Sequence, residues 1–490
     1  MKPLFSLVTL DKSLKQPVYL QVANQLTQLI KKSFLQGGQQ LPSSRILSDQ
    51  LNIHRKTVIR AYDELSAQGW LETRHGSGTF VAGHFPEAKP EKFINHNLTD
   101  KNSCETSGFD FGESPHFNRV IKKHTTRLHL DDGFPDPRLA PLEELSRAYR
   151  TQLLTGNSYV RLGYGEPAGS LWLRQELSAY LNETRGLNTT YENILITRGT
   201  VMGLYLASTG LLKKGDTVVT GELCWSSASI NFLQAGAEIL KIPVDAFGMD
   251  VDALENICKY KTIRMVYVTS HHHYPTTVAL RADRRNHLLK LSVKYGFIIF
   301  EDDYDYDFHY LSKPLLPLAS ADLDGMVLYC GSFTKTISPA FRVGYLVGSE
   351  NAVRYLAQLR RIIDRQGDTM LENAVADLLQ NGIIQRHLRK SLRTYRQRRD
   401  FFCDLLNTHL SPYLDFQKPI GGMAVWTKFN PSIDISTLAE KAIQNDLFLA
   451  DGTDNNTPTH VRNAIRLGFA SSTTAELEQC VDIMKRILSR

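Results

Sequence analysis

Seven short apolar runs recur through the middle of the chain, separated by longer segments with helical spacing of their apolar residues. The runs are NILIT (193–197), DTVVT (216–220), AEILKIPV (237–244), IRMVYVTS (263–270), GFIIFEDD (296–303), MVLYCGS (326–332) and GYLVG (344–348). This alternation predicts an α/β fold in which helices cover both faces of a mainly parallel sheet. Ligands of such sheets bind beyond the carboxyl ends of the strands, so functional residues are expected there.

The length of the chain limits the number of domains, and the distribution of its charge indicates what kind of partner it has. At 490 residues the chain is long enough for two or three domains. Its net charge is +6, and residues 1–82 hold ten Lys and Arg against five acidic residues, which is +5 of that total. Such a basic segment indicates either a partner with phosphates, such as nucleic acid, or a solvated basic surface.

Targeting and metal signals are weak. No run of eighteen uncharged apolar residues occurs, and the N-terminal MKPLFSLVTLDKSLK is weakly apolar for a signal peptide. We therefore expect a cytoplasmic protein with no membrane partner. The six cysteines lie far apart without a C-x-x-C pair, which predicts reduced structural thiols and no metal site.

Residues 11–82 have the pattern of a winged helix-turn-helix domain. Apolar residues spaced by three or four predict a helix from Val18 to about Phe34, ended by Gly37 and Gly38. A short helix at 46–51, a third helix at 55–67 and two strands at 70–74 and 79–81 follow. A small helical protein-interaction module with a basic surface is the alternative.

In a winged helix-turn-helix domain the third helix enters the major groove by its N-terminal residues, here His54, Arg55, Lys56 and Thr57. The string LPSSRILSDQLNIHRKTVIRAYDELSAQGWLETRHGSGTFV (41–81) resembles the DNA-binding domain of the GntR family. That resemblance implies a double-stranded DNA operator contacted by Arg45, Arg55, Lys56, Thr57, His75 and Gly76. His54 stands where the family commonly has a small hydroxyl residue, which leaves the base preference there open.

Residues 83–123 are polar and irregular, with prolines, glycines and short charged patches, and they predict an exposed linker. Residues 124–490 then form the α/β body. In that body, GFIIF runs into Glu301-Asp302-Asp303-Tyr304, and MVLYC runs into the stretch GSFTKTISPAFR (331–342). A carboxylate, a tyrosine and Lys335 thus reach one rim of the sheet.

Pyridoxal 5'-phosphate (PLP) requires these groups. Its aldehyde needs an amine, its pyridine nitrogen a carboxylate, and its phosphate cations and hydroxyls. Lys335 is placed to form the imine, and Ser332, Thr334 and Arg342 to hold the phosphate. Taken singly these features are weak, since an acidic strand end also suits Mg²⁺ and a basic turn can be structural.

The body resembles the fold-type I aminotransferases from about residue 125 onward, with a smaller C-terminal α/β subdomain implied. The matching pieces are DDGFPDPRLAP (131–141), GYGEPAGSLWLRQEL (163–177), ITRGTVMGLYL (196–206), HHHYPTT (271–277), EDDYDYDFHY (301–310), GSFTKTISPAFRVGYLVG (331–348) and IRLGFA (465–470).

By that resemblance Lys335 is the Schiff-base and catalytic lysine, Asp302 the partner of the ring nitrogen and Tyr304 the partner of the phenolic oxygen. The resemblance implies further cofactor contacts, by stacking or at the phosphate, from Trp225, Gly199, Thr200 and, in the neighbouring subunit, Tyr164. It also implies that Arg466 grips a ligand carboxylate, which its planar guanidinium suits.

The sequence departs from the family pattern at several positions. Val201 stands where a polar residue is common, Thr277 replaces the glycine of the usual P-T-G turn, and neither residue after Trp225 is basic. The histidines 271–273 point to alternate faces if they continue a strand, so they cannot converge on one metal ion. We expect at most one of them, His272 or His273, to face the cofactor.

A GntR-type head before an aminotransferase-type body is similar to the MocR/GabR regulators. The resemblance implies a homodimeric transcription regulator that senses an amine, an amino acid or PLP through an aldimine at Lys335. Two alternatives stay open: a working aminotransferase with an appended DNA-binding head, and a sensor that binds PLP and does no chemistry. Transamination is possible on this residue set, although physiological turnover is not expected.

Overall fold

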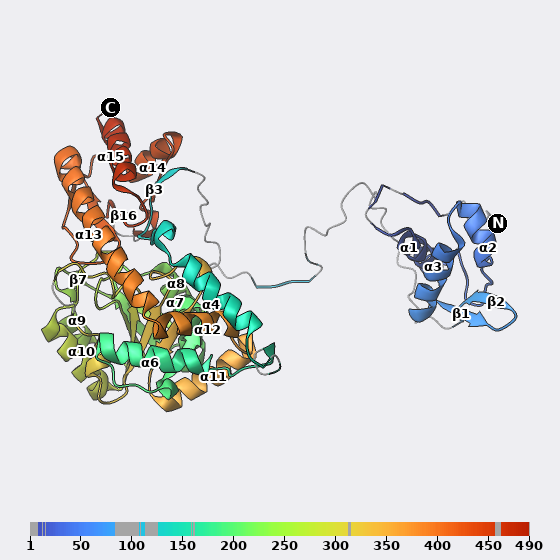
Figure 1. Ribbon diagram of the computed structural model, residues 1–490, viewed down its shortest axis with the longest axis horizontal. Helices are drawn as coiled ribbons and strands as arrows, with labels where there is room; N and C mark the ends of the chain where they lie inside the picture. Colours follow the sequence, from blue (N-terminus) through green and yellow to red (C-terminus); the bar gives the residue numbers. More distant parts are fainter. Residues whose placement is uncertain are drawn as a thin grey trace. The chain divides into compact units, whose positions relative to one another are not determined.

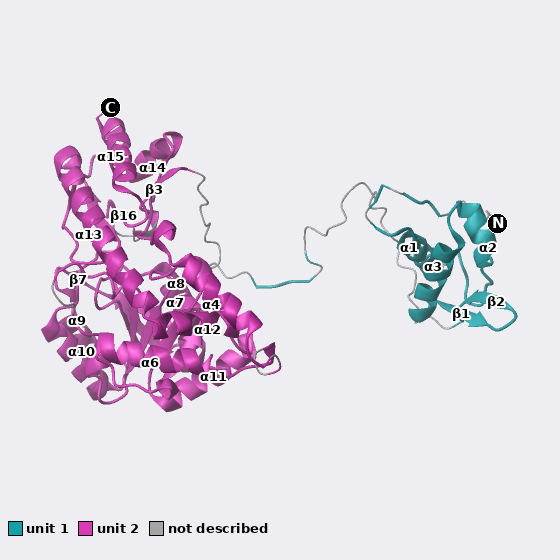
Figure 2. Ribbon diagram, viewed as in Figure 1, with its two compact units in different colours: residues 1–112 teal, residues 113–490 magenta. Residues whose placement is uncertain are grey.

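The computed structural model describes residues 8–11, 13–14, 16–83, 107, 109–112, 126–157, 159, 162–311, 315–455 and 462–489. The chain divides into two compact units, residues 1–112 and 113–490 (Figure 2). The predicted linker, 83–123, lies almost wholly outside the described residues. None of the helices in the described part of the chain has the length and apolarity needed to cross a bilayer.

The first unit has the predicted order of elements, three helices followed by a hairpin (Figure 1). They are α1 (Val18–Lys31), α2 (Ser44–Leu51), α3 (Arg55–Ala67), β1 (Leu71–Arg74) and β2 (Gly78–Val81). β1 and β2 pair antiparallel, with Leu71 opposite Val81. The three helices and the hairpin bury a shared apolar core that includes Val22, Leu26 and Leu65.

One detail of the head differs from the prediction. α1 ends at Lys31, before the two glycines, and Phe34 is 63% exposed where it was expected on the buried face. Ser33 has a φ of 58°, so the chain turns out of the helix and Leu35, which is buried, packs into the core instead.

The second unit is built on a seven-stranded sheet of order β4-β12-β11-β10-β9-β5-β6. Its strands are β4 (Ile194–Thr197), β5 (Thr217–Gly221), β6 (Glu238–Ile242), β9 (Met265–Val268), β10 (Ile298–Asp303), β11 (Val327–Ser332) and β12 (Gly344–Val347). All seven predicted runs are therefore strands. β12 pairs antiparallel with both of its neighbours, while the other pairs are parallel, so the predicted mainly parallel sheet is confirmed.

Each face of the sheet has its own apolar core because side chains alternate along a strand. Leu195, Phe300 and Leu346 belong to one core, and their neighbours Ile196, Ile299 and Tyr345 belong to the other. The helices of this unit are α4 (Leu142–Leu154), α6 (Leu171–Arg185), α7 (Gly199–Leu211), α8 (Ser226–Gln234), α9 (Val251–Cys258), α10 (Ala282–Tyr295), α11 (Glu350–Asp364), α12 (Thr369–Gln380), α13 (Ile383–Leu410), α14 (Ile435–Gln444) and α15 (Thr474–Leu488).

A second, smaller sheet forms from the C-terminal part, in the order β13-β14-β16. Its strands are β13 (Leu414–Phe416), β14 (Ala424–Phe429) and β16 (Ala464–Gly468), and they pair antiparallel. The remaining strands make two pairs: β3 (Leu128–Leu130) with β15 (Leu447–Leu449), and β7 (Val244–Asp245) with β8 (Gly248–Met249). The β3–β15 pair joins the start of this unit to its C-terminal elements, which confirms the smaller C-terminal subdomain.

Gly331, the second-last residue of β11, lies opposite Tyr345 of β12. A Cβ at Gly331 would lie 2.3 Å from Cζ of Tyr345, whose ring is buried and has no room to retreat. The glycine therefore lets the strand that carries the lysine stretch pass beneath an aromatic ring.

We expect Gly331→Ala to lower the free energy of unfolding of this unit by about 1–3 kcal/mol, because it overpacks a filled core. Denaturant unfolding of Gly331→Ala, Tyr345→Leu and the double variant measures this. The double variant should lose less than the sum of the two single losses. Losses that simply add would contradict a steric clash between the two positions.

Candidate cofactor pocket and nucleic-acid interface

A pocket of about 230 Å³ opens at the carboxyl ends of β10 and β11. Its lining residues are Asp132, Phe134, Thr200, Val201, Trp225, Tyr267, Tyr274, Asp302, Tyr304, Ser332, Thr334, Lys335, Pro339, Arg342 and Arg466. Most of the residues predicted for the cofactor line this one pocket. The exceptions are Gly199, whose neighbour Thr200 lines it, and Tyr164.

Asp302 is a buried carboxylate with one oxygen unpaired. Tyr267, on the neighbouring strand β9, donates a 2.7 Å hydrogen bond to Oδ2, whereas Oδ1 has no partner. Burial raises the pKa of Asp302 to about 7. A carboxylate buried without a cation is costly, and a protonated pyridine nitrogen at Oδ1 would supply the missing donor and charge. The site therefore fits the ring of PLP.

Lys335 follows β11 and points into the pocket. Its Nζ donates a 2.6 Å hydrogen bond to the carbonyl oxygen of Gly133 and lies 4.5 Å from the centre of the Phe134 ring. Burial lowers the pKa of this lysine. A lowered pKa increases the neutral fraction of the amine, which is the form that attacks an aldehyde.

Hydroxyls and an arginine gather beside the N-terminus of α7. Ser332 Oγ donates to Thr334 Oγ1 at 2.7 Å, and Arg342 Nη2 donates to the carbonyl oxygen of Arg198 at 2.9 Å. Gly199, the first residue of α7, has a φ of +74°, and a Cβ there would lie 2.8 Å from Nη2 of Arg342. The glycine thus lets the arginine approach the helix end, where free N–H groups favour an anion such as a phosphate.

The other predicted contacts differ in their placement. Tyr304 donates a 2.9 Å hydrogen bond to the carbonyl oxygen of His272, and Trp225 precedes the first turn of α8 at the pocket wall. Tyr164 does not line the pocket; it is 78% exposed, with the Arg365 guanidinium 3.8 Å from its ring centre. Its predicted role is in a neighbouring subunit, and it stays a prediction.

None of the histidines 271–273 lines the pocket, where we expected at most one of them, His272 or His273, to face the cofactor. β9 ends at Val268, so these residues belong to a turn and do not alternate as on a strand. Their nearest polar side chains differ: Asp303, Asp305 and Thr276 respectively, at 3.3, 2.8 and 3.1 Å. Burial lowers the pKa of His273 to about 4, so its ring is neutral.

The departures from the family pattern have local structural consequences. Val201 lines the pocket and is 41% exposed, so an apolar side chain replaces a polar one at its wall. Thr277 has a φ of 64°, a conformation that a β-branched residue seldom adopts, which explains why glycine is usual in that turn.

Sequence reasoning missed four pocket residues that matter here: Asp132, Phe134, Tyr267 and Tyr274. Asp132 and Phe134 lie within DDGFPDP, which was noticed only as a matching piece. Asp132 Oδ1 is 2.9 Å from Nε of Arg466, and the hydroxyl of Tyr274 donates to Asp132 Oδ2 at 3.0 Å. Arg466 also donates from Nη1 to the carbonyl oxygen of Pro275 at 3.1 Å.

In the head, five of the six predicted DNA contacts are exposed, and Thr57 is partly buried; the exposed ones are Arg45, Arg55, Lys56, His75 and Gly76. His54 has a structural role, because its Nδ1 accepts a 3.2 Å hydrogen bond from the backbone N–H of Lys56 and caps α3. The imidazole thereby replaces the hydroxyl cap that is common at such positions. Arg55 Nε donates to Ser44 Oγ at 3.2 Å, linking α3 to α2.

Comparison with known families agrees with the predictions for the N-terminal head and for the α/β body. A family model described as aminotransferase class I and II matches residues 136–484, well over half of the chain. The chain belongs to the class I and II aminotransferase family. A second model, bacterial regulatory proteins of the gntR family, matches residues 18–81, so the head is a GntR-family helix-turn-helix domain. The predicted combination of the two is confirmed.

Individual relatives show the same combination. The uncharacterized HTH-type transcriptional regulator YisV of Bacillus subtilis is 28% identical over 470 residues, which cover 93% of each chain. The probable rhizopine catabolism regulatory protein MocR of Rhizobium meliloti is 27% identical over 440 residues, covering 88% of this chain and 86% of that protein.

Among solved structures, Pyrococcus horikoshii kynurenine aminotransferase in complex with PMP matches with a TM-score of 0.68 and 26% identity. That match covers 74% of this chain and 92% of the enzyme. This family member is therefore similar to two regulators over most of its length and to the enzyme over about three quarters of it.

The raised pKa of Asp302 predicts a pH-dependent stability of the cofactor-free protein. The folded protein holds a proton up to about pH 7 that the unfolded chain releases near 3.8, so stability falls as the pH rises through this window. Asp302→Asn should remove this loss and raise the free energy of unfolding at pH 8 by up to about 4 kcal/mol, and by less at pH 5. Denaturant unfolding at both pH values measures the gap.

Asp303→Asn is the matched control, because the pKa of Asp303 is lowered by His271 and by a hydrogen bond from Tyr329. It should destabilise the protein at pH 8. If the free energies of unfolding of Asp302→Asn and wild type differed more at pH 5 than at pH 8, the raised pKa of Asp302 would be contradicted.

Proposed function

We propose that this protein is a cytoplasmic, PLP-binding transcription regulator whose head binds DNA and whose body senses an amino compound or PLP itself. The observation that carries the proposal is a pocket with a partly buried amine, Lys335, and an unpaired carboxylate oxygen, Asp302 Oδ1, in a chain that also has a GntR-family head. We propose domain limits of 11–82 for the head, 83–123 for a linker and 124–490 for the body.

The pocket residues divide among the parts of the cofactor. Asp302 would hold the ring nitrogen, Tyr304 the phenolic oxygen and Trp225 one face of the ring. The phosphate would bind at the N-terminus of α7, where Gly199 and Thr200 begin the helix and Ser332, Thr334 and Arg342 supply donors. The aldehyde of the bound cofactor condenses reversibly with amines, so Lys335 and an amino ligand would compete for it.

DNA binding would use the exposed N-terminal end of α3. Arg55 is suited to bidentate contact with guanine, and Lys56 and Thr57 to phosphates, with Arg45 from α2 beside them. The exposed hairpin tip with His75 and Gly76 would contact the adjacent groove or backbone.

Two copies are proposed to assemble. Tyr159, Leu162, Tyr164 and Ile362 are 93%, 65%, 78% and 82% exposed, an unusual number of large apolar residues to leave in water. A second copy would cover such residues, and its Tyr164 would complete the phosphate site. Two heads on one dimer would read two half-sites.

The ligand acts by population shift. It changes DNA binding only as far as its affinity differs between the two states of the protein, so tight binding alone is insufficient. Since Lys335, Asp302 and Tyr304 are all present, aminotransferase activity is the second candidate function. Sustained keto-acid production over many turnovers from an amino-acid panel would favour it. A gel shift that responds to PLP alone would favour a sensor of the cofactor itself.

Lys335→Ala should abolish the absorbance that PLP acquires when it binds to the protein, because the variant lacks the amine that condenses with the aldehyde. Gel shifts on DNA in the absence of ligand should change little. Lys241→Ala, an exposed lysine on β6, is the control and should keep the wild-type spectrum. An unchanged spectrum in Lys335→Ala would refute the assignment of this lysine.

Arg55→Ala should lower affinity for a DNA fragment selected from a random library by the wild-type protein, by about 1–3 kcal/mol, and relax the preference for one base. Lys56→Ala should weaken binding to all DNA sequences by a similar factor. It should also reduce the slope of log affinity against log salt concentration by about one. Fluorescence anisotropy titrations over a salt series measure both. Equal affinity and equal base preference in Arg55→Ala would show that α3 does not read bases.

A further inference from the structure

One face of α13 carries a row of exposed cations, which we call the α13 stripe. Its members are spaced by three or four residues, or adjoin one another, so they lie on one side of the helix: Arg386, Arg389, Lys390, Arg393 and Arg396. Residues 383–399 include no acidic residue. Arg386 and Arg393 donate to the backbone carbonyl oxygens of Asn381 and Arg389, which carry no net charge. Within the described part of the chain, none of the five cations forms an ion pair.

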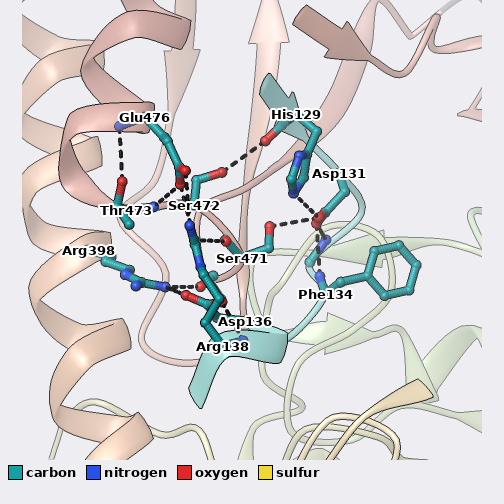
Figure 3. Close-up of polar contacts among 12 residues, drawn as sticks. His129, Asp131, Phe134, Asp136, Arg138, Arg398, Ser471, Ser472, Thr473 and Glu476 are labelled. Atoms are coloured by element: carbon teal, nitrogen blue, oxygen red, sulfur yellow. Dashed lines mark hydrogen bonds and ion pairs between the residues drawn. The ribbon is translucent and has the colours of Figure 1, made fainter. Parts of the chain in front are cut away.

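Arg398, on the buried side of the same helix, shows the contrast. It pairs with Asp136 at 2.8 Å (Figure 3). Asp136 belongs to the 131–136 loop, which Ser471 also holds, because its Oγ donates to Asp131 at 2.7 Å. A buried cation requires such a counter-charge. The exposed stripe has none from the described chain, so its charge is left for a partner.

The stripe works against the stability of its own helix. Arg386 with Lys390, and Arg389 with Arg393, are like-charge pairs one turn apart, and such pairs repel. Arg386 also lies in the first turn, which has no acidic residue and where the helix dipole disfavours cations. The chain carries +6 and residues 1–82 carry +5, so residues 83–490 carry only +1. The stripe is therefore a local concentration of charge on a nearly neutral body, which suits an anionic partner.

Duplex DNA is the anionic partner that the chain itself brings close. The GntR-family head binds DNA, and residues 84–125, which join head and body, can span at most about 150 Å. DNA held by the head thus stays at a high effective concentration near the body. The stripe is about 15 Å long, since Arg386 and Arg396 are ten residues apart. A duplex presents about nine phosphate charges over that length.

We propose that the α13 stripe is a second DNA-binding surface, on the body, for the duplex that the head holds. Its cations would contact phosphates flanking the site of the head, so the contact would add affinity and salt dependence without reading bases. The proposal rests on DNA binding by the head and goes beyond it. It does not depend on the cofactor.

The test uses fluorescence anisotropy titrations of the full-length protein over a salt series. The DNA is the fragment selected by wild type, used alone or extended by about 40 base pairs of unselected sequence on each side; each flank is about 136 Å long, within the reach of the joining segment. The stripe variant carries Arg389→Gln, Arg393→Gln and Arg396→Gln. On the long duplex it should bind about tenfold or more weakly than wild type at about 0.1 M salt, and its slope of log affinity against log salt concentration should be smaller by about 2.7.

A matched control removes three charges elsewhere on the same unit, with Lys213→Gln, Lys214→Gln and Lys290→Gln, all at exposed positions. It should bind the long duplex like wild type. Glutamine suits a helix and relieves the repulsion, so the stripe variant should unfold at no lower denaturant concentration than wild type. Arg393→Gln alone should reduce the slope by about 0.9.

The inference is overturned if the stripe variant equals wild type on the long duplex, or if the lysine control loses as much affinity. A stripe variant that loses affinity on the long duplex and less on the short one would place the contact on flanking DNA, as proposed. Failure of wild type to bind the short duplex would overturn DNA binding by the head, and this inference with it.

Discussion

The parallel pairing of β10 with β11 is the constraint on which the pocket depends. In that register Asp302 lies opposite Cys330, so the two strands end at the same rim of the sheet. The carboxylate thus stands on the last residues of one strand, and Lys335 follows the end of the next by three residues. A shift by one residue would move the carboxylate to the opposite face, because side chains alternate along a strand.

The same alternation separates three acidic residues that are adjacent in sequence. Glu301 and Asp303 lie on the face away from the pocket, and each has partners there. Glu301 accepts from the backbone N–H groups of Leu318 and Ala319, and Asp303 accepts from Tyr329. Asp302 accepts a hydrogen bond from Tyr267 at Oδ2, and its Oδ1 has no hydrogen-bond partner among the described residues. Asp303 also lies 3.3 Å from Nδ1 of His271, whereas Asp302 has no ion-pair partner among the described residues, an imbalance typical of functional sites.

Much of this architecture was predictable because continuous apolar runs bounded by glycines and polar residues have few other structural solutions. The lysine, carboxylate and tyrosine were found for the same reason, as each follows such a run. The direction of β12 was not predictable, because the apolar run GYLVG suits a parallel and an antiparallel strand equally well. The direction depends on the strands with which it pairs. The surroundings of the histidines 271–273 were not predictable, because β9 ends at Val268, two residues before the end of the predicted run. Asp132 was missed because two adjacent aspartates look equivalent until burial separates them.

The anchoring of the 131–136 loop has a mechanical consequence. This loop comes from the beginning of the larger unit, yet its fixed points are Ser471 and Arg398, the latter on the 28-residue helix α13. Any displacement of Asp132 or of the Gly133 carbonyl that Lys335 touches must strain these attachments. A movement of the Lys335 amine would therefore be transmitted through this loop to α13, the 28-residue helix of the C-terminal region.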